Sequence, residues 1–150
     1  KGGVVKWPNE RRRGMKKLGG MLIEDHGSGG GRKSSSIGIG INLDRTEDAL
    51  PRAAFLNEWN GQNNTPERLA ECIQKQFSAE LTRDFHSKAL EPAYRAILWG
   101  TDAPQRYLIN ECEEHGTVES VAADGRLTLL FKDGNVRSFG IDEVKWVDPN

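Results

Sequence analysis

Three short blocks of the chain place cationic, amide and glycine residues where they could handle a charged small molecule. The blocks are residues 6–10, Lys-Trp-Pro-Asn-Glu; residues 16–24, Lys-Lys-Leu-Gly-Gly-Met-Leu-Ile-Glu; and residues 37–42, Ile-Gly-Ile-Gly-Ile-Asn. Donors at strand ends, beside glycines that leave the backbone open, can bind a charged ligand. The blocks therefore predict a small-molecule site on neighbouring strands.

In this order and at this spacing, the blocks resemble the second half of the catalytic domain of biotin protein ligases. In that family they are Lys-Trp-Pro-Asn-Asp, Arg/Lys-Lys-Leu-x-Gly-x-Leu-x-Glu and Gly-x-Gly-x-Asn. The resemblance implies ATP-dependent activation of biotin to biotinyl-5'-AMP, followed by transfer to a lysine of a biotin carboxyl carrier protein. Biotin and ATP would be the substrates, with Mg²⁺ on the phosphates, and the chain itself offers no dedicated metal site.

The resemblance also implies two catalytic residues. Lys17 stands where the family places the cation that faces the two anionic substrates, although an isolated lysine at a strand start is normally only solvated. Glu10 stands where the family has Asp, with a role in the transfer step. Glutamate is one methylene longer, and a displacement of ~1 Å can cost about a hundredfold in rate.

Substrate binding is implied for seven further residues of the three blocks. The set is Lys6 and Asn9 for the phosphates or their Mg²⁺, Gly20, Leu22, Gly38 and Gly40 for the pocket around biotin, and Asn42 for adenine or triphosphate.

Strands over residues 4–7, 17–25 and 37–43 are expected to position these blocks, with a charged turn over residues 11–14. Arg11 to Arg13 could dock an acidic carrier or touch phosphate, but such a run is more often a solvated turn. Trp7 is expected to be a core aromatic. A short helix is expected around residues 53–59.

Two further helices are predicted. Thr65 as N-cap, Pro66 at the first helical position and Glu67 in the first turn mark a clear start. An apolar stripe recurs every four residues after it and is expected to face a core. The second helix covers residues 91–99 and is expected to end at Gly100. The stripe consists of Leu69, Ile73, Phe77, Leu81 and Phe85.

After Pro104 the hydrophobic period changes to two, which predicts five short strands over residues 106–111, 117–122, 126–131, 135–139 and 143–147. Asp-Gly pairs mark two of the hairpins. The expected fold is α+β. Residues 1–100 would form a partial mixed sheet with packed helices, the second half of a class II synthetase-like ligase domain. Residues 104–150 would form a small closed barrel of the Src-homology type.

Composition argues against several functions. A net charge of −1 with interspersed signs disfavours nucleic acid, and no apolar run approaches the ~20 residues of a membrane span. Cys72 and Cys112 are isolated, which fits a reducing cytoplasm. The histidines are also scattered and are expected at the surface; they are His26, His86 and His115.

Part of the family pattern is not in this sequence. The Gly-Arg-Gly-Arg segment that precedes the first block in the family is missing, and the chain opens as if joined in mid-domain. The sheet should then expose apolar surface, so that the chain self-associates or needs a partner chain supplying the first half. Weak or no activity is expected from the isolated chain. The alternatives are an inactive, truncated ligase-like binding module and, less favoured, a lipoate ligase.

Overall fold

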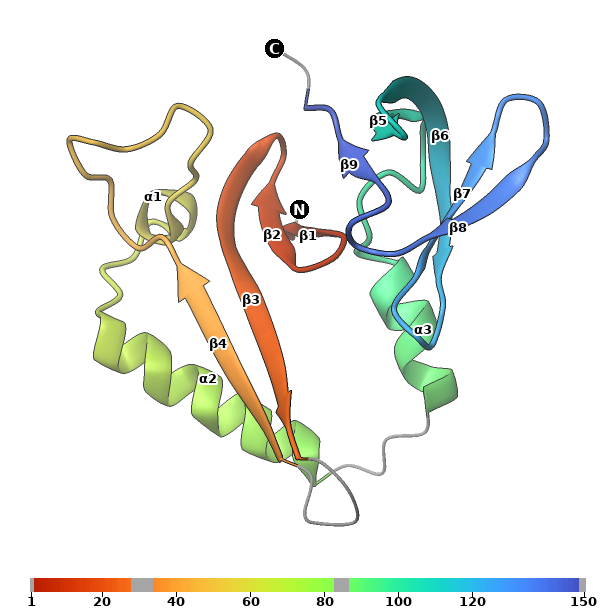
Figure 1. The fold of residues 1–150 in the computed structure, drawn as a ribbon. Helices are drawn as coiled ribbons and strands as arrows, with labels where there is room; N and C mark the ends of the chain where they lie inside the picture. Colours follow the sequence, from red (N-terminus) through yellow and green to blue (C-terminus); the bar gives the residue numbers. More distant parts are fainter. Residues whose placement is uncertain (1, 28–33, 83–86, 149–150) are drawn as a thin grey trace. The chain divides into compact units, whose positions relative to one another are not determined.

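The chain folds as two compact units in a computed structural model that describes residues 2–27, 34–82 and 87–148. One unit comprises residues 1–4 and 9–87, and the other comprises residues 5–8 and 88–150. The division into domains at 1–100 and 104–150 stays a prediction. Figure 1 shows the strands and helices of both units.

The first unit contains β2, β3 and β4 of a four-stranded sheet whose order is β1-β2-β3-β4, and β1 begins in the first unit and ends in the second. The long strand β3 pairs antiparallel with β2 on one side and with β4 on the other. The strands expected over residues 4–7, 17–25 and 37–43 are therefore confirmed. Their bounds are β1 (Val4–Lys6), β2 (Glu10–Arg13), β3 (Lys16–His26) and β4 (Ser34–Ile41).

The predicted charged turn over residues 11–14 is wrong, because the arginine run is itself the strand β2. Arg12 is buried, and its guanidinium pairs with Glu10, so the positive charge can be accommodated in the sheet. The chain reverses at Gly14, whose φ of 56° favours glycine.

Two helices complete the first unit, α1 (Leu56–Asn60) and α2 (Pro66–Leu81). The predicted start of α2 is confirmed: the Thr65 side chain accepts a hydrogen bond from the backbone N–H of Arg68 at 3.3 Å, and Pro66 follows the cap. The cap satisfies one of the free N–H groups of the first turn.

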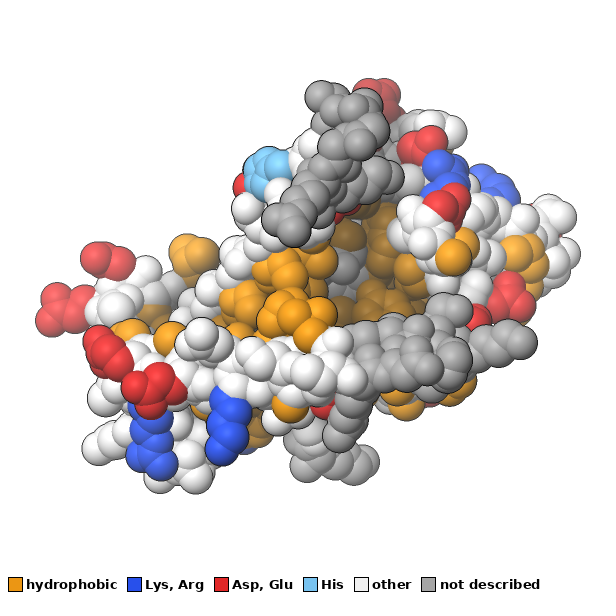
Figure 2. All heavy atoms as spheres, turned by 90° about the horizontal axis from the view of Figure 1, so that it is seen from below, with side chains coloured by type: hydrophobic (Ala, Val, Ile, Leu, Met, Phe, Trp, Pro, Cys, Tyr) orange, Lys and Arg blue, Asp and Glu red, His pale blue; other side chains and the backbone are white. Residues whose placement is uncertain are grey.

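The expected burial of the α2 stripe is wrong for its described residues, since no residue of this helix is buried. Phe77 remains 44% exposed and Leu81 61% exposed. The helix borders a groove of about 330 Å³ with Ile37 and Ile39 of β4, and one strand cannot cover a whole apolar stripe. Figure 2 shows hydrophobic side chains gathered on the face that is seen from below. Phe85 lies outside the described residues.

The second unit contains a five-stranded antiparallel sheet of order β8-β7-β6-β5-β9, which confirms the five predicted strands. Both Asp-Gly pairs lie in hairpin turns, with φ of 84° at Gly125 and at Gly134. The expected closed barrel is not observed among the described strands: β9 is two residues long and pairs only with β5, so the ladder stays open. The strands are β5 (Gln105–Ile109), β6 (Cys112–Val121), β7 (Leu127–Phe131), β8 (Val136–Phe139) and β9 (Lys145–Trp146).

The helix of the second unit, α3 (Ser87–Arg95), begins and ends earlier than the predicted 91–99. The helix ends early because backbone groups of residues 97 and 99 form hydrogen bonds with Val5 instead of within the helix. Val5 N–H donates to Ile97 C=O, and Trp99 N–H donates to Val5 C=O. Gly100 has a φ of 86°, as is typical of a glycine that ends a helix, but it lies beyond this bridge.

The core of the second unit is centred on Tyr107, Leu127 and Leu129, which are fully buried. Trp7 joins this core and its indole N–H donates to the Gly125 carbonyl at 2.9 Å, so the prediction of a core aromatic is confirmed. No described helix is long and apolar enough to cross a membrane.

Candidate functional site

A β-bulge sets the position of Lys17. Glu10 lies opposite Gly20 in the ladder between β2 and β3, but Arg12 lies opposite Lys17, so Leu18 is an extra residue on β3. Side chains alternate between the faces of a strand, and one extra residue reverses the alternation. Lys17 therefore shares a face with Gly20, although the two residues are three positions apart in the sequence.

Four of the predicted binding residues lie on this same face. Gly20 pairs with Gly40, and Leu22 pairs with Gly38, so the four residues form two directly opposite pairs. A side-chain carbon at Gly40 would meet no atom within 4 Å, and one at Gly38 would meet only the Leu22 carbonyl oxygen, at 4.0 Å. We call this surface of Gly20, Leu22, Gly38 and Gly40 the glycine face. It is open enough to accept a flat ligand against the backbone.

The carboxylate of Glu10 stands between two cations beside the glycine face. Its Oε1 accepts a hydrogen bond from Arg12 Nε at 2.5 Å, and its Oε2 lies 4.0 Å from Lys17 Nζ. The Arg12 side chain is only 5% exposed, whereas that of Lys17 is 57% exposed. The structure thus brings the two predicted catalytic residues together and leaves the lysine ammonium accessible to an anion.

Asn42 follows the glycine face at the end of β4. Its amide nitrogen donates to the carbonyl oxygens of Lys17 at 3.3 Å and of Ala54 at 3.2 Å. These bonds tie the start of β3 to the segment before α1. The amide nitrogen therefore stabilises the site, and a contact with adenine or triphosphate stays a prediction.

The remaining predicted residues are Asn9 and Lys6. Asn9 is exposed and its carbonyl oxygen accepts a hydrogen bond from the Met21 N–H at 3.0 Å. Lys6 belongs to the second unit, where its ammonium pairs with Asp148 at 3.3 Å and lies 5.5 Å from the centre of the Trp146 ring. Phosphate or Mg²⁺ contacts of both residues stay predictions.

Sequence reasoning missed two residues of the site, Arg12 and Gly19. Arg12 was hidden in a charge run that normally indicates a solvated turn. At Gly19 a side-chain carbon would lie 2.2 Å from the Gly40 carbonyl oxygen, so only glycine allows the two strands to approach. A glycine inside a strand is the sequence signal for such an approach.

A basic pocket of about 580 Å³ lies at the turn between β2 and β3, lined in part by Arg13, Lys16, Phe55 and Glu58. The hydrogen bond from Arg45 lowers the pKa of Glu58, and Lys16 and Arg13 add to the effect. The carboxylate is therefore ionised at neutral pH. It offsets part of the positive charge around the pocket.

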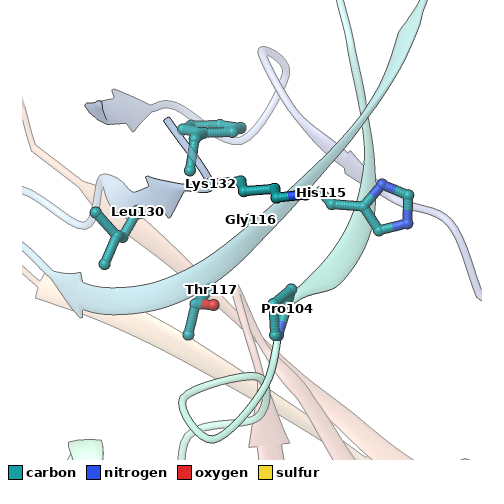
Figure 3. Close-up of a pocket in the computed structure, with 7 residues that line it drawn as sticks. Pro104, His115, Gly116, Thr117, Leu130 and Lys132 are labelled. Atoms are coloured by element: carbon teal, nitrogen blue, oxygen red, sulfur yellow. The ribbon is translucent and has the colours of Figure 1, made fainter. Parts of the chain in front are cut away.

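A second pocket, of about 450 Å³, lies on the β6–β7 ladder of the second unit. Its lining includes Thr117, Leu130 and Lys132, and Figure 3 shows the His115 imidazole directed away from Leu130 and Thr117. The lining of this pocket is mainly apolar.

The described histidines and cysteines do not assemble into a site. His26 and His115 are exposed, as predicted, and His86 lies outside the described residues. Cys72 and Cys112 are free and exposed. Within the described part of the chain, no group of three or more His, Cys, Asp or Glu residues could hold a metal ion.

The sequence is similar to that of a biotin ligase. No family model matches the chain. The biotin--[acetyl-CoA-carboxylase] ligase of Paracoccus denitrificans is 42% identical over 135 residues, which cover 84% of this chain and 56% of that protein. The chain thus spans little more than half the length of this relative.

The fold is similar to that of solved biotin protein ligases. The enzyme from Aquifex aeolicus matches with a TM-score of 0.73 at 21% identity, over 98% of this chain and 65% of that chain. The same enzyme in complex with biotin and ATP matches with a TM-score of 0.71 at 21% identity, over 98% of this chain and 62% of that chain. At this identity the likeness concerns the fold.

Proposed function

The chain is a homologue of the biotin protein ligases, and from this premise we propose that it supplies the lysine and the glycine-lined half of a biotin-activating site. The proposed reaction is ATP-dependent formation of biotinyl-5'-AMP, followed by transfer to a lysine of a biotin carboxyl carrier protein. The observation that supports it most is the bulge at Leu18, which places Lys17 on the same face as Gly20, Leu22, Gly38 and Gly40.

The first step brings two anions together. A biotin carboxylate oxygen attacks the α-phosphorus of ATP, a new P–O bond forms, and pyrophosphate leaves. A cation within ~4 Å contributes about 4 kcal/mol at an effective dielectric of ~20. Its contribution grows as charge builds on the phosphoryl oxygens. Lys17, with an accessible ammonium, is suited to this role.

The glycine face would hold the ligand. With no side chain at Gly38 or Gly40, the bicyclic ring system and chain of biotin can lie against the strands, and Leu22, at 58% exposure, supplies apolar contact. ATP would bring Mg²⁺ with its phosphates, because Mg²⁺ is usually bound through one or two carboxylates together with the substrate phosphates.

In the second step, an acceptor lysine amine attacks the biotinyl carbonyl carbon, an amide forms, and AMP leaves. We assign the Glu10 carboxylate to this step because it lies beside Lys17. The second candidate function is a binding module without turnover. The observation that favours it is that the Glu10 carboxylate, which we assign to the transfer step, is already engaged by Arg12 Nε at 2.5 Å.

Thermal unfolding with a non-hydrolysable biotinyl-adenylate analogue tests the proposal. Binding should raise the unfolding free energy by about 2.7 kcal/mol at a ligand concentration 100 times Kd. Biotin-dependent exchange of pyrophosphate into ATP then separates the two functions. Binding with exchange supports a ligase and excludes the module. Binding without exchange is expected both of the module and of a chain that supplies half of a ligase site. A chain that neither binds the analogue nor exchanges pyrophosphate would contradict both.

A further inference from the structure

The buried Arg12 side chain holds the carboxylate that lies nearest to Lys17. We propose that Arg12 is a positioning residue, which keeps Glu10 from forming a close ion pair with Lys17 and so keeps the lysine ammonium available to anionic substrates. The catalytic meaning of this role rests on the proposed function. The competition between the two cations for one carboxylate does not.

The geometry assigns Glu10 to Arg12. Arg12 Nε lies 2.5 Å from Oε1 of Glu10, whereas Lys17 Nζ lies 4.0 Å from Oε2, at the limit of an ion pair. The guanidinium is pre-organised, and its side chain, at 5% exposure, is held by the surrounding protein. The lysine side chain is 57% exposed and would lose conformational freedom on pairing. The carboxylate is therefore bound mainly by the arginine.

The bulge makes this competition unavoidable. Arg12 lies directly opposite Lys17, and Glu10 lies two residues before Arg12 on the same strand, so all three side chains share one face. Like charges in opposite positions repel each other, which turns Lys17 away from Arg12 and toward the open glycine face. Without the arginine, both oxygens of Glu10 could turn to Lys17 and neutralise it.

The test measures how readily Lys17 reacts with an amine-acetylating reagent in the 150-residue chain, by mass spectrometry of its peptides, with Lys16 as internal reference. In Arg12→Gln, Glu10 is free to capture the ammonium, so acetylation of Lys17 should slow by about two- to fivefold, the range of an exposed ion pair. Adding Glu10→Gln should restore the rate to the wild-type value or above. A purely structural role of Arg12 would give no such rescue.

Two results would overturn the proposal: an unchanged Lys17 rate in Arg12→Gln, or a double variant that stays as slow as the single one. Circular dichroism checks that each variant folds. If Arg12→Gln does not fold, Arg12→Lys takes its place, because lysine keeps the charge but lacks the planar guanidinium. The same two results for the Lys17 acetylation rate would then overturn the proposal. Binding of a biotinyl-adenylate analogue that keeps its phosphate should weaken in the single variant and recover in the double variant, in parallel with the acetylation rate of Lys17. If the wild type binds no analogue, the proposed function fails, while the acetylation rates still decide the role of Arg12.

Discussion

The ammonium group of Lys17 reaches the glycine face because β3 contains one extra residue. Leu18 is 4% exposed, so the bulge is anchored by a buried side chain. Bulges often re-aim a side chain next to a functional site. Here the consequence is that a lysine and a glycine three residues apart act on the same side of the sheet.

Replacing Lys17 by Gln should weaken binding of the biotinyl-adenylate analogue by about ten- to hundredfold, the range of a charge-assisted hydrogen bond. Stability should hardly change, since the side chain is 57% exposed. Titration calorimetry measures the affinity. Lys16→Gln is the matched control, because this neighbouring lysine is exposed but lines the basic pocket instead. Equal losses in both variants would argue against a specific role of Lys17.

At this scale the sequence motif indicated Lys17, Glu10 and the glycines but could not predict their geometry. Simple alternation would put Lys17 and Gly20 on opposite faces, and nothing in the sequence around Leu18 marks it as the extra residue. Arg12 was missed for a related reason. A run of arginines predicts a solvated turn, and the sequence does not reveal that Arg12 donates a hydrogen bond to the Glu10 carboxylate.

At the scale of elements, Gly19 and Gly40 have different roles where β3 and β4 approach each other closely. Gly19 allows the approach, and Gly40 leaves the glycine face open. Gly19→Ala would place a carbon 2.2 Å from the Gly40 carbonyl oxygen, so the strands must shift, and unfolding free energy should fall by about 1–3 kcal/mol. Gly40→Ala meets open space, so stability should change by no more than ~0.5 kcal/mol while analogue binding is lost. Urea unfolding and titration calorimetry measure the two effects. A Gly40→Ala variant that still binds tightly would refute the glycine face as a ligand site.

The core of the second sheet contains the hydroxyl group of Tyr107, which contributes no described hydrogen bond to stability. Tyr107 is 0% exposed, and its hydroxyl finds no hydrogen-bond partner among the described atoms. Tyr107→Phe should therefore leave the unfolding free energy unchanged or raise it by up to ~1 kcal/mol. Thermal unfolding at pH 8 measures this. A loss above ~2 kcal/mol would imply that the hydroxyl has a partner, since that is the usual penalty for an orphaned group.

The same substitution should change the response to alkali. Burial raises the pKa of Tyr107, so the folded state holds its proton where the unfolded chain, with a tyrosine pKa of about 10, releases it. The contribution of the Tyr107 hydroxyl to the unfolding free energy is fully present below the unfolded-state pKa of about 10 and is lost as the pH rises above it. Tyr107→Phe should therefore lose less stability than the wild type between pH 9 and pH 11.

Elements with strong local signals were predicted well. The cap at Thr65, the period of two after Pro104 and the Asp-Gly turns all depend on neighbours in the sequence. Elements decided by distant partners were not. The end of α3 depends on Val5, and the open edge of the second sheet depends on how short β9 is.

At the scale of the whole molecule, β3 and β4 have two different surfaces. One is the glycine face. The other carries Met21, Ile23, Ile37 and Ile39, which are 39–54% exposed, and the groove beside α2 lies against its isoleucines. Exposed aliphatic surface of this kind usually marks an interface. The residues of the relative that have no counterpart in this chain are the natural candidates to cover it, because the chain spans 56% of that protein.

The 150-residue polypeptide alone should therefore self-associate through this surface. Phe77, at 44% exposure, and Ile39, at 46%, lie on opposite sides of the groove beside α2, so the pair Phe77→Gln and Ile39→Thr should shift the chain toward monomer. Burying such side chains contributes roughly 25 cal/mol per Å² of apolar area, and their loss should weaken association by about tenfold or more. Sedimentation velocity at several concentrations measures the change. Leu130→Gln is the matched control, since Leu130 is 40% exposed but lies on the second unit. A wild-type chain that stays monomeric at the highest concentration, or an equal effect of the control, would show that this surface does not drive association.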